Sequence, residues 1–145
     1  MKLLIEDRIL EDVLRNRDSQ VNGSSALLSV VEAGYASGFV VPQTITDVYD
    51  QLRSHMSRSK AHGVMVDILS LVSVVEMTDE VIKEALALGW SDFRQALIGA
   101  AAIHGDISHL IVRNPNDYRS LKMPVLTPEE FVAQSESENF ELNIG

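Results

Sequence analysis

The sequence predicts an α/β domain with a parallel central sheet of about four to five strands and helices on both faces. Short apolar runs of strand length alternate along the chain with segments whose apolar residues recur at helical spacing. These runs are continuously apolar, which is typical of strands buried on both faces. The 145 residues, 46% hydrophobic and 23% charged, have the size and composition of one globular domain.

Five apolar runs are predicted as strands. The first ends abruptly in charge at Glu6, and the second is stopped by Pro42, whose ring removes a backbone donor. Turn residues follow the fourth run at 114–117. The predicted strands are residues 2–5, 38–41, 72–75, 110–112 and 124–126.

Helices are predicted between these strands. Residues 22–25 are predicted as a turn or an irregular start of the helix that follows, with Gly34 as the C-cap of that helix. Thr78 and Ser91 are predicted N-caps, and Pro128 marks the start of the last helix. The predicted helices cover residues 7–14, 26–33, 45–56, 59–71, 79–88, 92–103 and a final segment from 128. We expect one domain over residues 1–134 and a flexible acidic tail, rich in Ser, Glu and Asn, over 135–145.

Charge and composition exclude several classes of function. Zero cysteines exclude a disulfide framework, a thiolate metal site and a cysteine nucleophile. The net charge of −9 means that the chain as a whole repels nucleic acid, so a polyanionic partner needs a local basic patch or a bound cation. No apolar run reaches the length of a membrane span or of a signal peptide, and we expect a cytoplasmic protein without a membrane partner.

One local basic cluster stands out against the negative net charge. A solvated helix surface explains it, and a site for RNA phosphate is the alternative. Its members are Arg53, His55, Arg58, Lys60 and His62.

Acidic and amide side chains follow the strands at the positions where a parallel sheet places its ligands. Ligands of such sheets bind beyond the carboxyl ends of the strands. Oxygen ligands gathered at one edge are what a hard divalent cation prefers. The residues expected there are Glu6, Asp7, Arg8, Asp47, Asp92, Gln95, Arg113, Asn114 and Asp117.

Three segments give the chain its likeness to a known family. Residues 84–93 read EALALGWSDF, residues 112–118 read VRNPNDY, and residues 124–131 read PVLTPEEF. With this order of elements, the chain from Met1 to about Ala133 resembles a PIN domain, the small Mg-dependent nuclease fold that includes VapC-type toxins. The resemblance implies a three-layer fold, Mg or Mn as cofactor, RNA as substrate, a homodimer and an antitoxin-like protein partner.

The resemblance also implies roles for individual acids. Glu6, Asp47 and Asp117 correspond to catalytic carboxylates that hold the metal, and Asp92 is a further ligand. The metal would polarise water for attack on a phosphodiester. Simpler explanations stay open, since Asp47 and Asp92 also suit the positive end of a helix, and Asp117 also suits a turn.

The chain departs from the family pattern at positions that shape the metal site. The first strand ends Ile-Glu-Asp-Arg where the family has Ile-Asp-Thr-Asn, and Gln95 stands where the family has an acid. Two like charges about 4 Å apart repel by about 4 kcal/mol at an effective dielectric constant near 20, so clustered acids need a cation. We expect Arg8 to replace Mg in part as this cation, which would weaken or abolish cleavage.

The sequence offers two alternatives to a nuclease. A non-catalytic PIN-like module that binds nucleic acid or protein is the alternative. A phospho-receiver is a poor match, because the third strand runs into Glu76 and Met77 without an acceptor aspartate.

Overall fold

The computed structural model describes residues 1–15 and 21–144, and in them the chain forms one parallel five-stranded sheet. The strand order is β3-β2-β1-β4-β5, so β1 lies at the centre. All five predicted strands are present, with ends that differ by at most one residue. Their bounds are β1 (Lys2–Ile5), β2 (Ser37–Val40), β3 (Val72–Val74), β4 (His109–Ile111) and β5 (Val125–Leu126).

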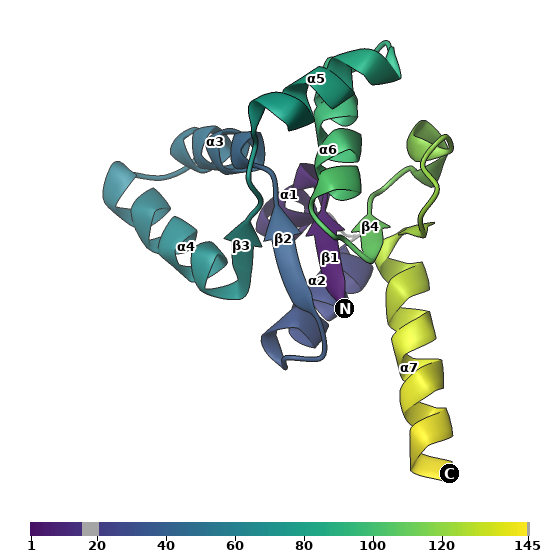
Figure 1. Ribbon diagram of the computed structural model, residues 1–145. Helices are drawn as coiled ribbons and strands as arrows, with labels where there is room; N and C mark the ends of the chain where they lie inside the picture. The colour runs from purple at the N-terminus through teal and green to yellow at the C-terminus, as the bar shows by residue number, and fades with distance from the viewer. Residues whose placement is uncertain (16–20, 145) are drawn as a thin grey trace.

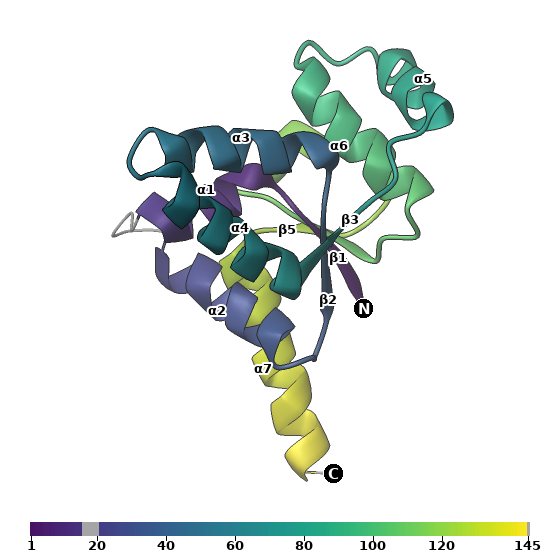
Figure 2. The ribbon, with the colours of Figure 1, turned by 90° about the vertical axis from the view of Figure 1, so that its left-hand side faces the viewer.

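Helices cover both faces of this sheet, which confirms the predicted fold class (Figures 1 and 2). Figure 2 shows α5 and α6 on one side of the strands and the remaining α-helices on the other. The helices are α1 (Asp7–Arg15), α2 (Val21–Glu32), α3 (Pro42–Arg53), α4 (Arg58–Leu71), α5 (Asp79–Leu88), α6 (Phe93–His104), the short 3-10 helix η1 (Pro115–Tyr118) and α7 (Pro128–Ile144).

The two sides of the sheet each have a hydrophobic core. Successive residues of β1 point to opposite faces, so Leu3 and Ile5 pack in one core and Leu4 in the other. The first core joins β1 to α1, α2, α3, α4 and α7, and the second joins it to α5 and α6. Because all strands run the same way, the residues after β1, β2 and β4 come out at one edge of the sheet.

Helix boundaries differ from the sequence prediction at several places, and α3 (Pro42–Arg53) begins and ends three residues earlier than the predicted 45–56. Residues 22–25 belong to α2 and not to a turn, and Gly23 suits the helix there because a Cβ would collide with the carboxylate of Glu129. Asp92, not Ser91, caps α6, since its side chain accepts a hydrogen bond from the backbone of Gln95. Helix α7 continues through residues 135–144, a stretch that contains no glycine or proline to stop it.

Among the described residues, no helix is both long and apolar enough to cross a membrane.

Candidate functional site

Glu6 follows β1 at the carboxyl edge of the sheet, and groups of the chain occupy both of its oxygens. Oε1 accepts a hydrogen bond from the backbone N–H of Arg113 at 3.2 Å, and Oε2 accepts one from the hydroxyl of Tyr118 at 2.9 Å. Burial raises the pKa of Glu6, while these two hydrogen bonds and the charge of Arg8 oppose the rise. Burial also raises the pKa of Tyr118, so its hydroxyl stays protonated and donates.

An arginine of α6, which lies on the other side of the sheet from α1 and α3, bridges two further acids of this edge. Arg94, in the first turn of α6, lies 3.5 Å from Asp7 and forms an ion pair with Asp47 of α3. The side chains of Asp7 and Asp47 are 14% and 27% exposed, so they share this cation at a partly buried site. The sequence predicted a cation from Arg8; Arg94 of α6 is the arginine that contacts Asp7 and Asp47, while the charge of Arg8 acts on Glu6. Arg8 is exposed in the first turn of α1.

Asp117 of η1 is held by amide groups. Gln95 donates from Nε2 to Oδ2 of Asp117 at 2.9 Å, and Asn114 donates to Oδ1 at 3.5 Å. Gln95 therefore lines the site, where its neutral side-chain amide donates a hydrogen bond to the carboxylate of Asp117. Asp92 turns its side chain back onto its own helix and accepts the N–H of Gln95 at 3.1 Å.

The contacts link the predicted residues at one edge but do not leave them arranged for a divalent cation. Among residues 1–15 and 21–144 there is no group of three or more His, Cys, Asp or Glu side chains that could hold a metal ion. Mg²⁺ demands near-octahedral oxygen ligands and binds through free carboxylates. Here Glu6 is hydrogen-bonded within the chain, and Arg94 neutralises two of the aspartates. The residues as arranged do not fit the Mg²⁺ or Mn²⁺ that the resemblance implies.

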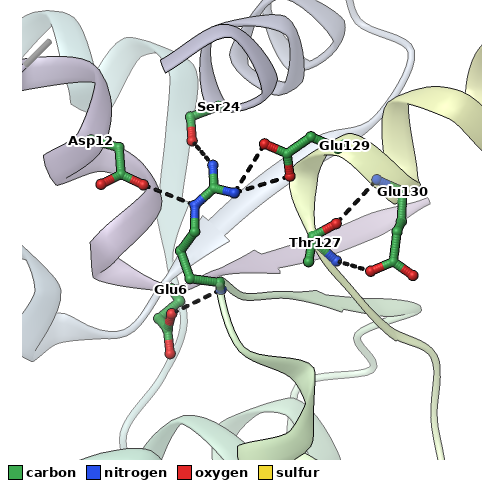
Figure 3. A network of polar contacts seen from close by, with 7 residues as sticks. Glu6, Asp12, Ser24, Thr127, Glu129 and Glu130 are labelled. Atoms are coloured by element: carbon green, nitrogen blue, oxygen red, sulfur yellow. Dashed lines mark hydrogen bonds and ion pairs between the residues drawn. The ribbon is translucent and has the colours of Figure 1, made fainter. Parts of the chain in front are cut away.

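Arg113 does not point its side chain at this edge, although the sequence predicted that it would line the site. Its backbone N–H donates to Glu6. Its guanidinium lies among α1, α2 and α7 and contacts three side chains there (Figure 3). It donates to Asp12 of α1 at 2.9 Å, to Ser24 of α2 at 2.5 Å and to both oxygens of Glu129 of α7 at 3.0 Å. We call these four residues the Arg113 network.

Sequence reasoning missed the partners in this network and also Arg94 and Tyr118. A signal existed for Asp12, since it lies three residues after Ile9 and so on the apolar face of the first helix. Another existed at α7, where Thr127 and Glu130 form a reciprocal capping box with hydrogen bonds of 3.1 and 3.2 Å (Figure 3). It fixes the start of α7 and thus the position of Glu129.

The sequence matches the family described as PIN domain over residues 2–116. The chain belongs to the PIN domain family. No curated protein matches the sequence.

Solved structures of PIN domains share this fold at low sequence identity. The chain is similar to a toxin–antitoxin complex from Klebsiella pneumoniae with a TM-score of 0.67 and 19% identity, over 87% of this chain and 97% of that chain. It is similar to VapBC-1 from nontypeable Haemophilus influenzae with a TM-score of 0.66 and 9% identity, over 88% and 98%. For VapBC2 from Rickettsia felis, bound to a promoter DNA fragment, the TM-score is 0.63 and the identity 12%, over 87% and 97%.

The buried Glu6 of this PIN domain gives its stability a specific pH dependence. Because burial raises the pKa of Glu6, the folded protein keeps a proton there at pH values where the unfolded chain, with an ordinary pKa of 4.5, has lost it. Native stability therefore falls as pH rises from 4.5 through the raised pKa. Glu6→Gln is neutral throughout, so we expect the stability of the native protein relative to this variant to decrease over that interval.

Urea unfolding of both proteins at several pH values between 4 and 8 measures this difference, since other groups titrate alike in the two. A difference that stays constant, or that grows with pH, would contradict a raised pKa of Glu6 in the folded protein.

Proposed function

We propose that this chain is a PIN-domain protein of the VapC toxin type in which metal-dependent RNA cleavage is weakened or lost. The observation that carries the proposal is the position of Arg94 between Asp7 and Asp47. Asp47, which the resemblance assigns to the metal, and its neighbour at this edge, Asp7, are here paired with a cation of the chain itself.

Arg94 and a divalent cation compete for the carboxylates of Asp7 and Asp47. A guanidinium stays charged at any physiological pH, and it is present at the high effective concentration of a tethered group. It supplies the positive charge that the acids need, but it has no open coordination position and cannot lower the pKa of a bound water. Gln95 adds no negative charge to attract a cation in its place.

RNA remains the proposed nucleic-acid partner, and its phosphates would meet the corner between α3 and α4. The exposed Arg53, Arg58 and Lys60 lie at the end of α3 and the start of α4. Because the whole chain carries −9, this basic corner is where a polyanion would be attracted.

A cleavage assay tests the proposal. We expect the purified protein to cleave single-stranded RNA no faster with Mg²⁺ or Mn²⁺ than in EDTA, and Asp47→Asn to change nothing. Metal-dependent cleavage that Asp47→Asn abolishes would establish a working nuclease and overturn the proposed loss.

RNA binding without cleavage is measured on the same samples by fluorescence polarisation. We expect Lys60→Glu to weaken binding and to lower its salt dependence, since each lost phosphate contact reduces the salt slope by about 1. Lys83→Glu, an equal charge change on the exposed surface of α5, is the control and should leave binding close to that of the native protein.

A non-catalytic protein-binding module is the second candidate. The similar structures from Rickettsia felis and Haemophilus influenzae are VapBC proteins, and the one from Klebsiella pneumoniae is a toxin–antitoxin complex. We infer an antitoxin-like partner and a homodimer as the assembly that would accompany it. Sedimentation velocity on the purified chain tests the dimer, and a monomer at all concentrations would exclude it.

A further inference from the structure

Part of the sheet is left uncovered on the side of α5 and α6. Parallel sheets are normally covered by helices on both faces, because their strands are apolar on both. The core on this side joins α5 and α6 mainly to β1 and β4. Figure 1, which views this side, shows β2 and β3 with no helix in front of them. A groove of about 570 Å³ lies there, between the start of α5 and the end of α6.

The floor of the groove is apolar. Phe39 of β2 and Val74 of β3 contribute to it, and Val81 of α5 adds to its side. Val74 is 43% exposed, which is unusual for a β-branched residue in a parallel sheet. Nζ of Lys2 lies 5.7 Å from the centroid of the Phe39 ring and makes a cation–π contact with it. The floor thus has the apolar character of a sheet face that a helix would cover.

The walls of the groove are acidic. Glu76 lies in the loop between β3 and α5, Glu80 in the first turn of α5 and Asp106 in the turn after α6, while His104 is the only basic side chain among the lining residues. Several carboxylates around an apolar floor repel one another and favour a cationic occupant. An RNA phosphate would be repelled from the same walls.

We propose that this groove binds a basic amphipathic helix of a partner protein. Its apolar stripe would cover Phe39 and Val74, and its lysine or arginine residues would face Glu76, Glu80 and Asp106. A helix completes the missing layer of the sheet, and this mode of binding places one apolar stripe in one groove. The proposal concerns a surface separate from the acidic edge and does not depend on whether the protein cleaves RNA.

A second copy of this chain is a less suitable occupant. Two copies of the chain repel each other, because each has a net charge of −9. The basic corner of α3 and α4 lies on the other side of the sheet from the groove. A contact between that corner and the groove would join different surfaces of the two copies and would not close into a two-fold dimer. The charge therefore favours a basic partner of another sequence.

The test uses a fluorescein-labelled peptide with leucine at helical spacing and lysine at the other positions. We expect binding by fluorescence polarisation, with amide shifts in NMR spectra confined to β3, the start of α5 and the end of α6. Val74→Asp and Glu80→Lys each should weaken binding by about tenfold or more, which is about 1.4 kcal/mol. Both residues are exposed, and circular dichroism confirms that the variants remain folded.

Matched controls lie outside the groove. Leu86→Asp changes an exposed apolar residue of α5, and Asp67→Lys reverses a charge on α4, so neither should alter binding. Equal binding of a peptide with glutamate in place of lysine would overturn the proposed charge recognition. Amide shifts centred elsewhere would overturn the site. Concentration-dependent dimerisation that Val74→Asp abolishes would show that the occupant is a second copy.

Discussion

Replacing Arg113 with methionine is expected to lower the free energy of unfolding by about 3–5 kcal/mol, the range measured when one partner of a buried ion pair is removed. Asp12 is fully buried, and its carboxylate is 2.9 Å from the Arg113 guanidinium. Without Arg113 this charge stays in the core, and Ser24 and Glu129 lose their shared donor. Chemical denaturation followed by circular dichroism measures the loss.

Arg119→Met is the control for this prediction. Arg119 is exposed and bonds to Asn116 within its own turn, so its replacement should change stability by no more than about 0.5 kcal/mol. In the double variant Asp12→Asn with Arg113→Met, the loss should be smaller than the sum of the single losses, because no buried charge is stranded. An Arg113→Met variant as stable as the control would show that the Arg113 network does not hold the helices.

The strands and layers of this PIN domain could be predicted because they depend on local patterns. Short apolar runs bounded by charge or turn residues, such as 2–5, predict buried strands, and Pro42 and Gly89 begin or end elements through their own backbone geometry. Residues 22–25 were misread as a turn because their glycine and serines favour turns locally. Their helix is set by the packing of α2 against α7, which brings Gly23 against Glu129, and no local pattern carries this information.

The candidate site was predictable in position but not in its pairing. The acids after β1 and in α3 were expected at one edge, because the direction of parallel strands dictates it. Arg94 reaches Asp7 and Asp47 from α6, which is far from both acids in the sequence, so no local pattern predicts this pairing. Arg113 was assigned to the site because it follows β4. Its side chain points instead toward Asp12, because a buried carboxylate without a partner costs more free energy than an exposed one.

Arg94→Ala is expected to make the acidic edge bind Mn²⁺ at least about tenfold more tightly than the native protein does, a change of about 1.4 kcal/mol. Removal of the guanidinium leaves Asp7 and Asp47 without the cation that they share, and two carboxylates that faced one guanidinium favour a cation from solution. Adding Gln95→Asp should tighten binding further, because it replaces an amide by a carboxylate next to Asp117.

Isothermal titration of Mn²⁺ into the native protein, Arg94→Ala and Arg8→Ala distinguishes a cation supplied by the chain from one taken up from solution. The account predicts weak binding to the native protein and to Arg8→Ala, and clear saturable binding to Arg94→Ala. Tight binding to the native protein that Arg94→Ala leaves unchanged would contradict it, because Arg94 would then not occupy the place of the metal.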